Sequence, residues 1–144
     1  MRTHILVVLG VGLLIAADAK DDDAAKKELK KLSGTYVMAS GESKAEKLSE
    51  ESIKRAKMTI EGEKYTATFG EGAVTGTLKA DPTKTPKEID ATDSEKKTIL
   101  GIYKFDQDQF TVCFAPPGKD RPKEFSVKAG TGDFIHVWKK KAKE

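Results

Sequence analysis

After residue 33 the chain alternates apolar and polar residues in short runs, and turns rich in Gly, Pro and Asp separate these runs. A period of two is typical of a β-strand with one buried face. About eight or nine short strands at regular spacing predict an all-β fold built from antiparallel hairpins. The expected strands cover residues 36–38, 58–60, 65–69, 74–80, 89–92, 97–105, 109–114, 124–127 and 133–139.

The expected architecture is a β-barrel that begins with a helix. Residues 24–32 have a helix-forming composition, with Leu29 and Leu32 on one face, and the helix should end near Gly34. Strands do not alternate with helices, which argues against a parallel α/β fold. We therefore expect an antiparallel up-and-down barrel of about eight short strands behind a short N-terminal helix. A β-sandwich also fits the pattern.

Two polar segments are expected as connections between strands. Ser40–Ala56 is rich in Glu and Lys, and we expect a long loop with one helical turn over Ser49–Arg55, where Ser49 offers an N-cap. Asp81–Pro86 holds two prolines, which have no amide proton for strand pairing. A turn at Glu61–Glu63 should join two strands into a hairpin.

The N-terminus has the pattern of a signal peptide. Arg2 precedes an uncharged run over Ile5–Ala17, and Ala17-Asp18-Ala19 is a small-x-small cleavage pattern. Cleavage after Ala19 would make this a small exported protein of bacterial type, periplasmic or secreted, without a stable membrane span. An uncleaved anchor is the alternative, although a spanning helix needs roughly 20 apolar residues. The expected organisation is a signal peptide (1–19), an acidic tail and short helix (20–32), a barrel domain (33–140) and a basic tail (141–144).

Composition and charge narrow the classes of function. The 144 residues are 34% charged and 38% hydrophobic, which fits one soluble globular domain. The net charge is only +3, and the only basic run is Lys139–Lys141, so we expect no nucleic-acid partner. A single cysteine, Cys113, cannot form an intramolecular disulfide. Stability must then come from packing and strand pairing, and we expect a monomer.

Several stretches resemble a known family. Leu32–Tyr36 is similar to the G-x-W opening strand of lipocalin-like barrels, with Tyr36 in place of Trp. Further similar stretches, in the same order, are residues 81–90, 100–103, 106–108, 112–115 and 121–125. Together they resemble an uncharacterised lipocalin-like secreted domain family abundant in planctomycete-type bacteria. Lys139–Lys140 stands where that family tends to have Arg. The resemblance implies a barrel, and it implies no activity because the family has no established one.

No catalytic residue, metal site or cofactor is expected. Cys113 and His136 could form a nucleophile–base pair if neighbouring strands brought them together. However, Cys113 alternates out of phase with its apolar neighbours, and His136 shares a face with Phe134 and Trp138. The favoured interpretation is a packed thiol and a partly buried imidazole. One His and one Cys are too few for a zinc site, which needs three or four ligands.

Two carboxylates near Arg121 allow two interpretations. Asp90 and Glu124 could act as an acid–base pair at the mouth of a barrel. Alternatively, Arg121 could pair with Glu124 or Asp90 and hold a Pro-rich loop in place. We favour the structural pair, because Pro86 and Pro122 mark loops that need to be held.

The barrel interior is the expected ligand site. An eight-stranded barrel has room for its own side chains or for one small ligand. Small residues (Ala67, Gly76 and Gly101) leave space that an aromatic ring could also fill. The first hypothesis is an exported non-enzymatic binding module for a small apolar ligand. The second is a solid-core interaction or structural domain that contacts an envelope protein, and the third is an enzyme of unrecognised type. The residues expected to line a pocket are Tyr65, Phe69, Leu78, Tyr103, Phe110 and Phe114.

Overall fold

The computed structural model describes residues 23–44 and 46–142. The predicted signal peptide therefore lies outside the described residues. A helix over residues 23–32 comes first, as predicted. The elements that follow are β1 (Gly34–Ser43), β2 (Glu46–Lys47), α2 (Glu50–Arg55), β3 (Ala56–Glu61), β4 (Lys64–Phe69), β5 (Gly72–Asp81), β6 (Lys87–Asp93), β7 (Thr98–Asp106), β8 (Gln109–Phe114) and β9 (Phe134–Lys140).

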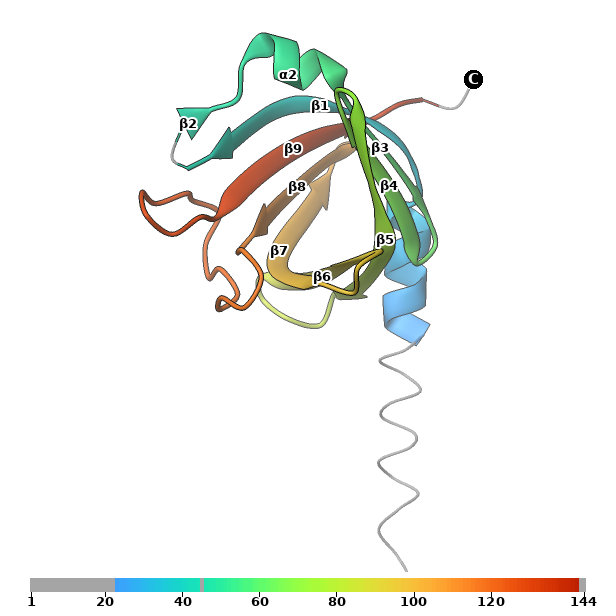
Figure 1. Cartoon of the computed structure of the whole chain (residues 1–144). Coiled ribbons are helices and arrows are strands. Elements are labelled where there is room, and N and C mark those ends of the chain that lie inside the picture. Colours follow the sequence, from blue (N-terminus) through green and yellow to red (C-terminus); the bar gives the residue numbers. More distant parts are fainter. Residues whose placement is uncertain (1–22, 45, 143–144) are drawn as a thin grey trace, which may run out of the picture.

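The strands form a closed antiparallel barrel, which confirms the predicted fold and excludes the sandwich (Figure 1). β1 pairs with β3, and from β3 to β9 each strand pairs with the next along the chain. β9 then pairs with β1 and completes the ring. β2 is an extra strand that pairs with the end of β1. Closure leaves every barrel strand with a partner on both sides, so the edge groups of an open sheet are absent from the ring.

The start of the predicted long connection is a strand. β1 continues through Ser40–Ser43, which pairs with Phe134–Val137 of β9 after a register shift beyond Met38. Backbone pairing with β9, and with β2 at Glu42 and Ser43, forms this part of the strand, although its side chains are mostly polar. The predicted helical turn is present as α2, and its N-cap Ser49 accepts a hydrogen bond from the Ser52 amide at 3.2 Å.

The predicted strand over residues 124–127 is wrong. These residues belong to an irregular segment, 115–133, that joins β8 to β9. β8 already pairs with β7 and β9, so the closed barrel offers this segment no free edge. Instead it covers the outer face of the barrel, where it buries Ile102 and Cys113.

The helix over residues 23–32 closes one end of the barrel. Its Leu29 and Leu32 are buried, and the Tyr36 hydroxyl at the start of β1 donates to the Leu32 carbonyl at 2.6 Å. Glu28 is also buried, where its carboxylate accepts from the Tyr103 hydroxyl at 3.0 Å and from Lys87 at 3.1 Å. We call this the closed end. Within the described part of the chain, no helix is long and apolar enough to cross a membrane.

Lys140 strengthens the same end from the last strand. Its ammonium donates to the Lys31 carbonyl at the C-terminal end of the helix, at 3.0 Å. A cation is favourable there because the carbonyl end of a helix carries partial negative charge. Lys140 and Tyr36 therefore tie β9 and β1 to the helix.

Candidate functional site

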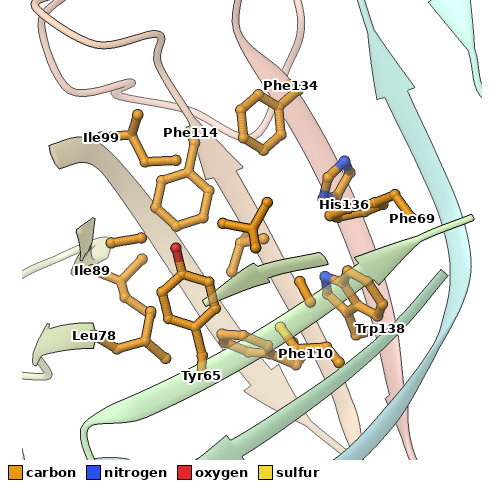
Figure 2. Close-up of a pocket in the computed structure, with 15 residues that line it drawn as sticks. Tyr65, Phe69, Leu78, Ile89, Ile99, Phe110, Phe114, Phe134, His136 and Trp138 are labelled. Atoms are coloured by element: carbon orange, nitrogen blue, oxygen red, sulfur yellow. The ribbon is translucent and has the colours of Figure 1, made fainter. Parts of the chain in front are cut away.

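The other end of the barrel, which we call the open end, leads into a cavity of about 210 Å³ (Figure 2). This end is formed where β4, β6 and β8 finish and where β5, β7 and β9 begin. The cavity is lined almost wholly by apolar side chains: Met58, Tyr65, Ala67, Phe69, Val74, Leu78, Ile89, Ala91, Ile99, Phe110, Val112, Phe114, Phe134, His136 and Trp138.

Small residues explain where the interior is filled and where it is open. A Cβ on Gly101 would lie 2.5 Å from the Phe114 ring, so that ring occupies the space that this glycine leaves. Ala67 and Ala91 instead line the cavity. An aromatic ring therefore fills one of the anticipated spaces, whereas the space beside the two alanines stays open.

Strand β9 supplies an aromatic wall of the cavity. The ring of His136 lies 4.8 Å from Phe134 and 5.8 Å from Trp138, and the Phe69 ring from β4 lies 5.6 Å from His136. Burial lowers the pKa of His136 to about 4, because the charged imidazolium would lose its hydration here. At neutral pH this wall is uncharged.

Tyr65 provides a polar atom inside the cavity. Figure 2 shows its hydroxyl pointing into the space between Ile89 and Phe114. Burial raises the pKa of Tyr65, and the nearby carboxylate of Asp93 raises it further. The hydroxyl therefore keeps its proton at neutral pH, and no hydrogen bond from it is found within residues 23–44 and 46–142. It is available to donate to a polar atom of a bound molecule.

Beyond the cavity lies a more polar space, which we call the mouth hollow. It has a volume of about 440 Å³ and lies between α2, the β4–β5 turn and the start of β9. Phe69, Phe134 and His136 line both spaces, so the cavity and the hollow lie next to each other. The remaining residues of the hollow are Ser43, Leu48, Ser52, Arg55 and Gly70.

Most of the residues expected to bind a ligand lie around the cavity. Five of the six line it, namely Tyr65, Phe69, Leu78, Phe110 and Phe114. Tyr103 does not, because it lies at the closed end and donates its hydroxyl to Glu28. The sequence did not identify the three β9 residues that line the cavity, Phe134, His136 and Trp138. The apolar face of β9 was visible in the sequence, but alternation alone cannot distinguish a side chain that borders a cavity from one in a packed core.

Arg121 lies in an ion-pair cluster against the outer face of the barrel. Its guanidinium Nη1 is 2.8 Å from Asp90 Oδ1, and its Nε is 3.5 Å from Glu88 Oε1. The same Nη1 donates to the Gly101 carbonyl at 2.8 Å. Glu124 contacts Lys128 instead, at 3.2 Å. The structure therefore brings together Arg121 and Asp90 but not Glu124, and none of them lines the cavity.

Cys113 and His136 lie on opposite faces of the barrel wall. β8 and β9 are paired, but Val112 is the residue directly opposite His136. Cys113 faces outward beneath the 115–133 segment, where its thiol is 3.8 Å from the Ser126 carbonyl. Burial raises the pKa of Cys113 to about 11, and Asp133 adds to the rise. This pair is not a nucleophile and its base. No cluster of three or more metal-ligating side chains is present in the described residues.

Comparisons with protein-family models, with curated proteins and with solved structures gave no match to this chain. The similarity to the lipocalin-like secreted family therefore stays a prediction from the sequence.

Proposed function

We propose that this chain is an exported, non-enzymatic binding module that holds one small apolar ligand in its barrel cavity. The observation that carries the proposal is the cavity itself, about 210 Å³ of space within a nearly apolar lining. Removing apolar surface from water contributes roughly 25 cal/mol per Å². An empty apolar cavity also forfeits packing contacts that a ligand would restore.

The size of the cavity limits the ligand. An apolar protein cavity of about 150 Å³ holds benzene, so about 210 Å³ corresponds to roughly eight non-hydrogen atoms. Drug-sized ligands need larger pockets, from about 300 Å³ upward. The alternative function, a solid-core domain that contacts an envelope protein, calls for a filled interior. The open space beside Ala67 and Ala91 favours the binding module.

The test uses 1-octanol as a neutral probe and the fluorescence of Trp138, which lines the cavity and is the only tryptophan of the chain. We expect saturable binding with a dissociation constant of about 10 µM to 1 mM, as befits a ligand of this size. Calorimetry provides a second readout. Native mass spectrometry of the freshly purified protein should also show a co-purified small molecule.

A pair of matched variants locates the site. Ala91→Leu places extra volume in the cavity and should abolish binding of 1-octanol, whereas Ala73→Leu makes the same change at an exposed position of β5 and should leave binding unchanged. If 1-octanol fails to bind and no molecule co-purifies, the proposed function is wrong. Equal binding by both variants would place the ligand elsewhere.

A further inference from the structure

The charged part of the site is confined to its mouth. The cavity is lined by uncharged side chains, since His136 is neutral at pH 7. The mouth hollow, which lies next to it, is also lined by the polar residues Ser43, Ser52 and Arg55. Among the described residues that line this hollow, Arg55 is the only charged one.

Arg55 lines the mouth hollow from the C-terminal end of α2. It is the last residue of α2, immediately before β3, and its side chain runs beside the β4–β5 turn, where a Cβ on Gly70 would lie 3.9 Å from Arg55 Cδ. Gly70 follows Phe69, whose ring lines both spaces. Arg55 therefore lines the mouth hollow on the side of Phe69, which also lines the apolar cavity.

The present partner of Arg55 is easily exchanged. Its Nη2 is 2.6 Å from Glu51 Oε1 of the same helix, but both side chains are largely exposed, at 60% and 73%. Such i,i+4 pairs on a helix surface contribute little. A ligand carboxylate can replace Glu51 and form the two parallel hydrogen bonds that a guanidinium offers.

From this arrangement we infer that the ligand is a small amphiphilic monocarboxylate, with an apolar group of about eight carbons in the cavity and its carboxylate at Arg55 in the mouth hollow. This inference rests on the proposed function, since it assigns the chemical class of the ligand for the same site. It also assigns the direction of binding. The apolar end enters first and lies against the aromatic wall.

The experiment compares octanoate with 1-octanol, which have the same number of carbons and differ in the head group and its charge. At pH 7 and low salt, octanoate should bind about three- to tenfold more tightly than 1-octanol. The preference should shrink as the salt concentration rises, because the entrance is exposed to solvent. Equal or weaker binding of octanoate would overturn the inference while leaving the proposed function intact. Failure of both probes would overturn the proposed function itself.

Three variants assign the effect to Arg55. Arg55→Gln should reduce the preference for octanoate to about onefold, with binding of 1-octanol unchanged, which also shows that the variant is folded. Glu51→Gln removes the competing carboxylate and should tighten octanoate binding about twofold. Lys79→Gln makes the same change in net charge at an exposed position toward the closed end, and it should have no effect. A preference that survives Arg55→Gln, or a loss of 1-octanol binding in that variant, would overturn the inference.

Discussion

His136 is a titratable side chain that the barrel keeps uncharged. It packs among Phe69, Phe134 and Trp138, and its pKa is lowered to about 4 by loss of hydration alone. In the unfolded chain its pKa is about 6.5. The unfolded state therefore binds a proton at a higher pH than the native state does, and this difference links stability to pH.

We expect His136 to make the protein less stable as the pH falls from 7 to 4. Above pH 6.5 the imidazole is neutral in both states and costs nothing. Between pH 6.5 and about 4 only the unfolded state is protonated, so the free energy of unfolding should drop by on the order of 3 kcal/mol. Urea unfolding of the parent and of His136→Phe at pH 7 and pH 4 measures this.

The comparison of the two proteins isolates His136 from the carboxylates that titrate in the same range. The parent should lose more stability than His136→Phe over this interval. An equal loss in both would show that the folded barrel does not lower the pKa of His136.

Among the elements, the N-terminal helix has the clearest stabilising role. It was predicted from Leu29 and Leu32 on one face, and both side chains are buried against the closed end of the barrel. A short helix would be marginal in water if it were isolated. Its stability here comes from that packing and from the hydrogen bonds of Tyr36 and Lys140 to its C-terminal carbonyls.

Leu32→Ala should therefore destabilise the protein by about 2–5 kcal/mol, because it removes a fully buried side chain and leaves a cavity. Lys30→Ala, at an exposed position of the same helix, should change stability by less than about 0.5 kcal/mol. Chemical denaturation of the two variants checks this. If both variants lose similarly little stability, the helix contributes nothing to the closed end.

At the same scale, the sequence predicted hairpins better than it predicted irregular segments. The β3–β4 hairpin was predicted correctly, because alternation on both sides of a Gly-containing turn is a local signal. Residues 124–127 have the local pattern of a strand but find no free edge. Ser40–Ser43 lacks that pattern but pairs with β9. Both errors arise because pairing partners are chosen by the closed ring.

Over the whole molecule, stability and binding should trade against each other. The barrel leaves space unfilled beside Ala91, whereas Ala56 is buried in the same core without lining that space. A protein that needs only a stable barrel would gain by filling it. The cavity therefore marks where packing is incomplete, as the proposed binding function requires.

Ala91→Leu should raise the free energy of unfolding by about 1 kcal/mol, because its added carbons occupy the cavity. Ala56→Leu introduces the same carbons into packed space and should cost about 1–3 kcal/mol. Thermal or urea unfolding of both, without added ligand, makes the comparison. A large destabilisation by Ala91→Leu would indicate that the cavity cannot accept further atoms.

The sequence by itself determined where most strands lie and which face of each is apolar. These properties depend on the alternation of side chains along an extended backbone, which is local. It therefore indicated five of the residues that line the cavity, namely Tyr65, Phe69, Leu78, Phe110 and Phe114. It also placed Cys113 on the opposite face of its strand from Phe110, Val112 and Phe114.

Only the tertiary structure decided that the barrel closes, that the helix blocks one end and that the cavity at the other end lies next to a hollow lined by Arg55. The cavity belongs to the same level. Its volume is the difference between the space that eight strands enclose and the side chains that fill it, so it depends on which residues meet across the barrel. The Phe114 ring fills the space beside Gly101, whereas the space beside Ala91, which is paired with Leu78 and Ile99, stays open.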